Sequence, residues 1–476
     1  MTLAKSDVSA LFTQAALAAE RFRAGLDDRP QRPGMDYAAL RAAAAADVLP
    51  TPESGLSAQE TLDSLIQLAE PGLHASPAPR FFGWVIGASH PVGVAADWLT
   101  SAWGQNCGNH HTAPSAAFIE EIAARWLLDI LHLPATASVG FVSGATMANF
   151  VCLAAARTHV LRQAGWDVEA DGLFAAPEVQ VLIGDEAHTS VYAALRMLGW
   201  GQRRLRRVAT DDHGAMRPDA LLAQLADCTG PVIVVTQAGQ INTGAFDPLA
   251  QIVDAAHRHG AWVHVDGAFG LWARACPSTC PLTLAYEQAD SWATDGHKWL
   301  QTPYDCGYAI VAHPEAHRRA MTFAASYLPQ ADDAERNPAE YVPELSRRAR
   351  GFATWAMLRH FGRDGIATMV EQHCMLARHA AQRLADEPGI AVLNDVVLNQ
   401  LIVQFGADRD PQQADALTRA TIARIVADGT CFVGGAEWRG RWVMRMSIIG
   451  WETQLADVDR AVDAMLSAWR VEAGRG

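Results

Sequence analysis

The sequence contains neither a long apolar run nor an excess of positive charge. Its 476 residues include no stretch approaching about eighteen uninterrupted apolar side chains, so we expect no membrane-spanning helix. Lys and Arg number 38 against 52 Asp and Glu, and the net charge of −14 argues against a nucleic-acid partner. The first residues, Met1 to Asp7, lack the charged-then-apolar order of a signal peptide. These absences together favour a cytoplasmic protein.

Cysteine is also scarce. Eight cysteines in a chain of this length are too few for the disulfide framework of a small secreted protein. Cys276 and Cys280 form the one close pair, in a proline-containing loop without histidines or a second pair at zinc spacing. We therefore predict no metal site.

Apolar runs indicate an α/β protein with more than one core. Short β-branched runs at residues 179–183, 231–236 and 262–265, with helical stretches between them, predict a mostly parallel sheet. Beyond residue 360 the order of helices and strands changes to an α+β pattern. We expect three units: a helical N-terminal segment over 1–90, a large α/β domain over 91–360 and a smaller α+β domain over 361–476.

Two helices are predicted from capping and spacing. Ser57 stands three residues before Glu60, the order of a capping box at a helix start. Within residues 109–133, apolar side chains recur at helical spacing, so we expect them in the core. They are Phe118, Ile122, Trp126, Leu127 and Ile130.

The stretch from Trp262 to Leu300 holds the residues with the clearest chemistry. Asp266 ends a buried strand, which is where open α/β sheets place their ligand crevice. About thirty residues later, Lys298 lies between His297 and Trp299 in a polar turn after a second short strand. A lysine amine held in such a turn can act as a nucleophile toward carbonyl groups.

A strand-end carboxylate and a lysine in this order suit pyridoxal 5'-phosphate. The lysine amine forms a Schiff base with the cofactor, and the carboxylate pairs with the protonated pyridine nitrogen, which keeps the ring an electron sink. Each residue alone has an ordinary explanation, since a strand-end Asp is often structural and a lysine is usually a solvated charge.

A third feature precedes these two in the chain. Residues Gly140 to Asn149 form a Gly/Ser/Thr turn that opens a helical run. Backbone N–H groups and the helix dipole at such a turn favour an anion. Many helices begin in this way for capping alone, so the turn indicates a phosphate site only in combination with Asp266 and Lys298.

These motifs resemble those of the group II pyridoxal-phosphate-dependent amino acid decarboxylases, which act on aromatic amino acids, glutamate or histidine. The resemblance extends from Phe22 to Met465. It is most specific in His-Val-Asp-x-Ala-Phe-Gly at 264–270 and Asp-Ser-x-x-x-Asp-x-His-Lys-Trp-Leu at 290–300. It implies the aspartate-aminotransferase-like fold type I, and a homodimer with the active site near the subunit interface and an N-terminal arm across the partner.

The resemblance also implies roles for single residues. Lys298 would hold the cofactor, Asp266 would pair with its ring nitrogen, and His188 would stack on the ring. Without the family, a core or helix-capping histidine would be the better explanation of His188. The other implied cofactor contacts are Gly144, Ala145, Thr146, Gln237, Ala268 and His297.

Two positions depart from the family pattern. Met147 stands where many members carry Glu. Asp295 stands where several members carry Asn near the phosphate. Because a carboxylate there would repel a phosphate dianion, we expect Asp295 to face a hydrogen-bond donor.

Residues 77–84 resemble the family's Pro-x-Phe-Phe-Gly segment, whose continuation lines the substrate pocket. The matching pocket residues are Trp84, Val85, Ile86 and His90. An aromatic cluster near a turn is also typical of a core or an interface. The aromatic character of the segment favours an apolar or aromatic amino acid as substrate.

The polar stretch Pro329 to Pro338 has few apolar anchors, so we expect it to be mobile. In the decarboxylases a loop here carries a tyrosine that protonates the quinonoid carbon. Matching the arginines at 347, 348 and 350 to the family's arginine-rich segment puts Pro338 at that tyrosine's place, three residues from Tyr341. Either Tyr341 is the catalytic proton donor or the site protonates differently.

The sequence therefore predicts decarboxylation of an L-amino acid to an amine. The mismatch at Pro338 leaves other reactions on the same scaffold open, namely oxidative deamination to an aldehyde or a C–C lyase reaction. Transamination is a separate alternative. A non-catalytic pyridoxal-binding protein is the remaining alternative, and the joint presence of Lys298, Asp266 and His188 counts against it.

Overall fold

A computed structural model describes residues 5–44, 51–322 and 335–474. Its largest sheet has seven strands in the order β1-β7-β6-β5-β4-β2-β3, and β7 alone among them runs antiparallel to its neighbours. The prediction of a mostly parallel sheet is confirmed. The strands are β1 (Ser138–Val142), β2 (Gln180–Gly184), β3 (Arg206–Val208), β4 (Val232–Gln237), β5 (Trp262–Asp266), β6 (Ser291–Asp295) and β7 (Gly307–Val311).

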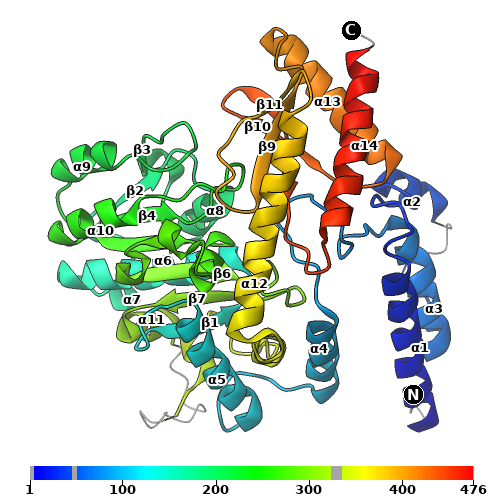
Figure 1. Ribbon diagram of the computed structural model, residues 1–476. Helices are drawn as coiled ribbons and strands as arrows, with labels where there is room; N and C mark the ends of the chain where they lie inside the picture. The colour runs from blue at the N-terminus through cyan, green and yellow to red at the C-terminus, as the bar shows by residue number, and fades with distance from the viewer. Residues whose placement is uncertain (1–4, 45–50, 323–334, 475–476) are drawn as a thin grey trace.

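Helices cover both faces of this sheet (Figure 1). Strands β4 to β7 are buried along their whole length, which explains their continuous apolar runs. One face packs against α6 (Ala145–Gln163), α8 (Thr189–Met197) and α11 (Pro314–Met321). The other face packs against α5 (Pro114–Ile130), α9 (Pro218–Ala226) and α10 (Leu249–Arg258), while the short helix α7 (Val168–Asp171) contacts α6.

A second sheet of four antiparallel strands has the order β10-β11-β9-β8. The long helix α12 reaches from the large sheet to this second sheet in Figure 1. Strand β10 was not expected, because its two glycines give it little strand propensity. The elements are α12 (Gly351–Ala385), β8 (Ile390–Val392), β9 (Gln400–Phe405), α13 (Pro411–Asp428), β10 (Gly434–Trp438), β11 (Arg441–Ser447) and α14 (Leu455–Ala473).

The first three helices lie at the side of the molecule away from the large sheet, and α4 lies between them and α12 (Figure 1). The four helices are α1 (Lys5–Ala24), α2 (Tyr37–Ala43), α3 (Ala58–Ala69) and α4 (Pro91–Trp103). The predicted capping box of α3 is confirmed, since the Ser57 hydroxyl accepts from the Glu60 N–H and the Glu60 carboxylate accepts from the Ser57 N–H. Helices α1, α3 and α4 line an apolar groove of about 610 Å³. The division into three units at residues 90 and 360 stays a prediction.

Short 3₁₀ turns connect several elements. They lie at Glu70–Gly72, Gln202–Arg204, Gly270–Ala275, Cys280–Thr283, Tyr286–Gln288 and Pro338–Tyr341.

One expected core residue is exposed. Leu127 and Ile130 of α5 are buried and Ile122 and Trp126 are half-buried, but the Phe118 side chain is 61% exposed. Phe118 lies two residues from the fully buried Glu120, which turns it to the opposite face of a helix with 3.6 residues per turn.

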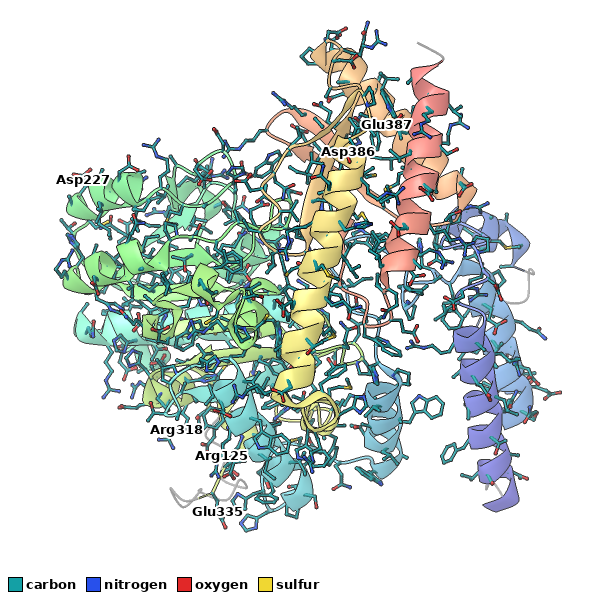
Figure 2. All side chains as sticks on the ribbon, viewed as in Figure 1. Arg125, Asp227, Arg318, Glu335, Asp386 and Glu387 are labelled. Atoms are coloured by element: carbon teal, nitrogen blue, oxygen red, sulfur yellow. The ribbon has the colours of Figure 1, made fainter. Side chains whose placement is uncertain are left out.

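All eight cysteines are free thiols. Among the helices in the described ranges, none has the length and apolar character needed to cross a bilayer. Figure 2 shows charged side chains such as Asp227, Asp386 and Glu387 at the periphery of the molecule. The expected mobile stretch at Pro329 to Pro338 lies largely outside the described residues, because the structure describes the chain again from residue 335.

Candidate active site

The carboxyl ends of the parallel strands bring the predicted site residues to one edge of the large sheet. Asp266 ends β5, and its neighbours in the sheet are Gln237 at the end of β4 and Ala293 of β6. The turn after β1 leads into α6 at Gly144, and the turn after β2 leads into α8 at His188. Lateral pairing of the strands thus joins motifs that lie far apart in the chain.

Lys298 lies in the turn after β6, and its amine faces a carboxylate. The Nζ atom is 3.1 Å from Asp295 Oδ2 and 5.7 Å from the centre of the Phe269 ring. The neighbouring Trp299 points elsewhere, because its indole is buried in the core, where Nε1 donates to His373. The charged neighbour of the amine is therefore Asp295.

Asp295 faces donors on two sides, as its position in the sequence predicted. Its Oδ1 accepts from the Ala145 N–H at 2.6 Å and lies 3.5 Å from His297 Nε2, while Oδ2 faces Lys298. Burial lowers the pKa of His297, and the charge of Asp295 partly offsets this effect. The carboxylate joins the lysine turn to the first turn of α6.

Asp266 is buried at the strand end. Burial raises the pKa of Asp266, while the positive charges of His188 and Lys298 act in the opposite direction. The Ala268 N–H donates to Asp266 Oδ1 at 3.3 Å. A bound cation beside Asp266 would hold the carboxylate in its charged form.

The structure shows His188 as a helix cap, and its stacking on the cofactor ring stays a prediction. Its Nδ1 caps α8 by accepting from the Ser190 N–H at 3.3 Å. Burial lowers the pKa of His188, and Asp266 raises it, so the ring lies within electrostatic range of the strand-end acid. The cap fixes the ring at the same edge of the sheet as Lys298.

The turn at Gly144 leaves space only for backbone. A Cβ atom on Gly144 would lie 3.1 Å from His297 Cε1 and 3.2 Å from Asp295 Oδ1. The N–H groups in the first turn of the 19-residue helix α6 have no partner within the helix and favour an anion. Thr146 is exposed in this first turn, so its hydroxyl is accessible to a ligand.

Gln237 and Ala268 also lie at this edge. Gln237 and Asp266 line a small cavity together with Glu186 and Gly214. The Ala268 carbonyl accepts from the Asp295 N–H at 2.9 Å, so the backbone at Ala268 links the two acids.

Arg445 on β11 belongs to this site, and the sequence analysis missed it. Burial lowers the pKa of Arg445 to about 10, and its charge lowers the pKa of His188. Its Nη2 donates to the Trp84 carbonyl at 3.3 Å, and its Nε has no hydrogen-bond partner within the described residues. No carboxylate of the described chain lies within ion-pair distance of it. The feature of the sequence that could have identified Arg445 is an arginine among the apolar residues of a strand.

The predicted pocket segment runs beside the lysine turn. The Gly87 N–H donates to the His297 carbonyl at 2.9 Å, and a Cβ on Gly87 would lie 2.3 Å from the Lys298 carbonyl oxygen. The Trp84 side chain is half-exposed, Val85 is buried and Ile86 is half-buried. These contacts place residues 84–87 next to the site.

His90 lies elsewhere. It caps α4 and packs against the rings of His360, Phe361 and Trp451, with a centroid distance of 4.3 Å to Trp451. Burial and the charge of His360 lower the pKa of His90 to about 4. Its assignment to the substrate pocket stays a prediction.

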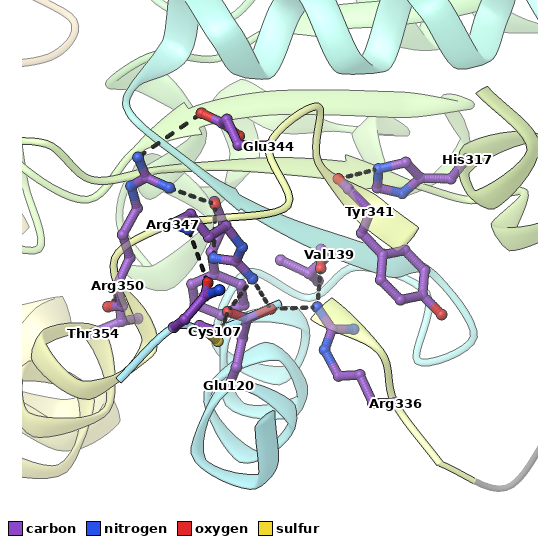
Figure 3. Close-up of polar contacts among 12 residues, drawn as sticks. Cys107, Glu120, Val139, His317, Arg336, Tyr341, Glu344, Arg347, Arg350 and Thr354 are labelled. Atoms are coloured by element: carbon purple, nitrogen blue, oxygen red, sulfur yellow. Dashed lines mark hydrogen bonds and ion pairs between the residues drawn. The ribbon is translucent and has the colours of Figure 1, made fainter. Parts of the chain in front are cut away.

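Tyr341 packs against His317 and Arg336, which are not among the predicted cofactor-binding residues. Its carbonyl faces His317 Nε2 at 3.0 Å, and its ring lies beside the Arg336 guanidinium, whose central carbon is 4.5 Å from the ring centre (Figure 3). The family-based role of Tyr341 as proton donor therefore stays a prediction. The same part of the sequence contains a second tyrosine, Tyr327, which lies outside the described residues.

Figure 3 also shows a buried ion-pair cluster beneath this segment. Glu120 of α5 accepts from Arg347 at 2.8 Å and from Arg336 at 3.0 Å. Arg347 and Arg350 each donate to the Phe141 carbonyl at 3.4 Å, near the end of β1. The cluster fixes the segment after residue 335 against the strand that leads to the Gly144 turn.

These donors and acceptors fit pyridoxal 5'-phosphate. The first turn of α6 suits the phosphate, Asp266 suits a protonated pyridine nitrogen, and Lys298 suits the aldehyde carbon. A mostly parallel sheet with these residues at its carboxyl edge, beside a smaller antiparallel sheet, is the arrangement of fold type I pyridoxal-phosphate enzymes.

The chain belongs to the family defined by the pyridoxal-dependent decarboxylase conserved domain, which matches residues 45–405. It is 29% identical over 333 residues to an aromatic-L-amino-acid decarboxylase of Bacillus atrophaeus, covering 68% of this chain and 67% of that protein. It is 29% identical over 436 residues to an L-2,4-diaminobutyrate decarboxylase of Rhizobium meliloti, covering 88% and 83%. The crystal structure of Oryza sativa TDC with PLP and tryptamine superposes with a TM-score of 0.90 over 99% of both chains at 22% identity.

The protein is thus a pyridoxal-phosphate-dependent amino acid decarboxylase, as the sequence motifs predicted.

Proposed function

We propose that this chain releases the α-carboxylate of an apolar or aromatic L-amino acid as CO2 and adds a proton to the same carbon to give the amine. The observation that carries the proposal is the convergence of Lys298, Asp266, His188 and Arg445 at one edge of the large sheet. Pyridoxal phosphate, when bound, supplies an electron sink for the electron pair left at Cα.

The residues divide the remaining work. Lys298 is the amine that holds the cofactor and exchanges it for the substrate amine. Asp266 keeps the ring nitrogen protonated, and the positive charge on that nitrogen in return favours the ionised form of Asp266. Arg445, with its unpartnered Nε, is placed to pair with a substrate carboxylate.

The preference for an apolar side chain rests on the aromatic residues beside the lysine turn. Trp84 lies 5.3 Å from the Phe432 ring and 5.7 Å from the Phe81 ring, measured between ring centres. Such a cluster would pack against an aromatic side chain without adding a charge. The relative that acts on diaminobutyrate marks the competing class, an amino acid with a cationic side chain.

A second candidate reaction is oxidative decarboxylation to an aldehyde, with O2 and water consumed and CO2, ammonia and hydrogen peroxide released. The observation that favours it is Pro338 at the place of the expected tyrosine, together with the packing of Tyr341 against His317 and Arg336. A site without a positioned proton donor leaves the substrate carbon exposed to O2 for longer.

One assay decides between these reactions. The purified protein is incubated with single amino acids, and amine, aldehyde, ammonia and peroxide are measured in the same samples. Amine in equal amount to CO2 supports decarboxylation, whereas aldehyde with peroxide supports the second candidate. The variants Tyr341→Phe and Tyr327→Phe show which tyrosine controls the ratio.

The cofactor bond is tested first. Wild-type protein is expected to absorb visible light from bound pyridoxal phosphate, and borohydride should abolish this absorbance. Lys298→Ala should lack the borohydride-sensitive band while keeping its fold by circular dichroism. A wild-type protein that stays colourless with excess cofactor would refute the proposal.

We also propose that the chain forms a homodimer through its N-terminal helices. Phe12, Leu65 and Trp98 are exposed apolar residues of α1, α3 and α4, the helices that line the apolar groove. Sedimentation at micromolar concentration should give the mass of a dimer, and Phe12→Asp should weaken association. A monomeric wild-type protein would contradict this proposal.

A further inference from the structure

Three elements that carry cofactor-site residues are joined by one buried chain of side-chain hydrogen bonds. His264 of β5 lies at its centre, with Nε2 at 2.8 Å from Asn149 Oδ1 of α6 and Nδ1 at 2.9 Å from Ser291 Oγ of β6. The Trp262 indole donates to the same Ser291 oxygen at 2.9 Å. His264, Asn149 and Ser291 have no solvent exposure.

The direction of each proton follows from the donors available. The Trp262 N–H donates to Ser291 Oγ, so the serine hydroxyl is free to donate onward to His264 Nδ1. His264 Nε2 then carries the ring proton and donates it to the Asn149 amide oxygen. Burial lowers the pKa of His264 to about 3, so the ring stays neutral at ordinary pH.

Each member of the chain lies close in sequence to a residue of the cofactor site. Asn149 follows Gly144 by five residues on the same helix, and Ser291 precedes Asp295 by four residues on the same strand. His264 precedes Asp266 by two residues, so both side chains lie on the same face of β5. A shift at the ring of His264 is therefore transmitted to all three.

Two further side-chain contacts join α6 to strands of the large sheet. The Ala145 N–H donates to Asp295 Oδ1 of β6 at 2.6 Å, so it ties the start of the helix to the lysine strand. Cys152 of α6 donates its thiol to the Trp292 carbonyl at 3.4 Å and to the Ile310 carbonyl at 3.6 Å. A thiol is a poor donor compared with an imidazole N–H. Neither of these contacts reaches β5, which the bond between His264 and Asn149 joins to the helix.

We propose that His264 is a positioning residue for the cofactor, which sets the anion-binding turn of α6 in register with Asp266 and Lys298. The proposal rests on the cofactor site assigned above and adds a residue that does not touch the cofactor. His264 acts through Asn149 on the helix and through Ser291 on the lysine strand. Loss of His264 loosens the spacing between the Gly144 turn, which holds the phosphate, and Asp266, which pairs with the ring nitrogen.

The test is the affinity of apo-protein for pyridoxal phosphate, measured by absorbance titration without substrate. His264→Gln removes the ring from a buried network, and a lost buried hydrogen bond of about 1.4 kcal/mol corresponds to about tenfold weaker binding. Asn149→Ala should also weaken binding, by no more than His264→Gln does, and the double variant should be little worse than His264→Gln, since the bond to Asn149 is already lost in that variant.

His317 provides a matched control in the same protein. Its ring is equally buried and has both nitrogens bonded, Nδ1 to Ser138 Oγ at 2.8 Å and Nε2 to the Tyr341 carbonyl at 3.0 Å. His317→Gln should lower thermal stability by a similar amount and leave the dissociation constant for pyridoxal phosphate unchanged.

Three outcomes are informative. Unchanged cofactor affinity in His264→Gln, or an equal loss in His317→Gln, would overturn the positioning role. If His264→Gln does not fold, Asn149→Ala carries the test, because it keeps the ring and removes its acceptor. Failure of the wild-type protein to bind pyridoxal phosphate would instead refute the cofactor site itself.

Discussion

Removal of the charge on Glu120 should destabilise the protein strongly. The Glu120 side chain is 0% exposed and pairs with Arg347, which is 1% exposed, and with Arg336, which is 12% exposed. Burial alone would raise the pKa of Glu120, but the two arginines hold it below its ordinary value. Glu120→Gln therefore leaves two guanidinium groups beside an uncharged amide in a buried site.

The size of the effect follows from this geometry. Loss of one partner from a buried ion pair costs about 3–5 kcal/mol, because the remaining charge is desolvated without compensation. An unfolding entropy of about 2.1 cal/mol/K per residue gives about 1 kcal/mol/K for the whole chain. If the chain unfolds as one unit, Tm should fall by about 3–5 °C.

The neighbouring residue supplies the control. Glu121 pairs with Arg125 one helical turn away, on a surface where the Arg125 side chain is 76% exposed. Such pairs contribute about 0.3–0.5 kcal/mol, so Glu121→Gln should lower Tm by less than about 1 °C.

Differential scanning fluorimetry at one scan rate compares the two variants with the wild type, and circular dichroism verifies their folding. Equal Tm values for Glu120→Gln and Glu121→Gln would refute the reasoning. The double variant Glu120→Gln with Arg347→Met should lower Tm by less than the sum of the two single decreases, because the second substitution removes a buried charge that the first leaves unpaired. Additive losses would show that Glu120 and Arg347 are not coupled.

Two further predictions concern substrate binding and pH. Arg445→Met should lower kcat/KM by about 10–100-fold, mainly through KM, because hydrogen bonds to charged groups contribute about 1.5–3 kcal/mol. The control variant Arg441→Met, at an exposed position of the same strand, should leave kcat/KM unchanged. Equal kinetics in both variants would exclude Arg445 from substrate binding. Burial alone would raise the pKa of Asp290, but hydrogen bonds from His257 and His313 hold that pKa below 3.8. The hydrogen bond to Asp290 raises the pKa of His257 above 6.5. The stabilisation from Asp290 is lost as pH falls through its lowered pKa, and that from His257 is lost as pH rises through its raised pKa. The Tm advantage of the wild type over Asp290→Asn should therefore be largest between pH 3.8 and 6.5, and a Tm difference that is constant with pH would contradict the assignment.

The sequence predicted those parts of the site that depend on local pattern. The apolar β-branched runs gave the parallel strands, and parallel strands bring their carboxyl ends to one edge, so the order of motifs along the chain was enough to place Asp266 and Lys298 together. The donors around Asp295 followed from electrostatics alone. Each of these inferences uses neighbours in sequence or in one sheet.

The sequence could not predict contacts between the two sheets. The charge of Arg445 lowers the pKa of His188 although the two residues belong to different sheets, and no local pattern encodes that packing. The direction of Trp299 and the exposure of Phe118 depend in the same way on which face of a turn or helix meets the core. Strand β10 contains two glycines and forms through its pairing with β11.

Strand β7, which runs opposite to the other strands of the large sheet, has a consequence for synthesis of the chain. Strand β1 lies at the edge of the large sheet and pairs with β7, so Ser138 has its partner at Val311, 173 positions later. The segment that leads to the Gly144 turn therefore gains its strand partner only after the residues of the lysine turn have left the ribosome. During that interval β1 exposes an unpaired apolar strand, which is the kind of segment that chaperones bind and that aggregates when synthesis outpaces folding.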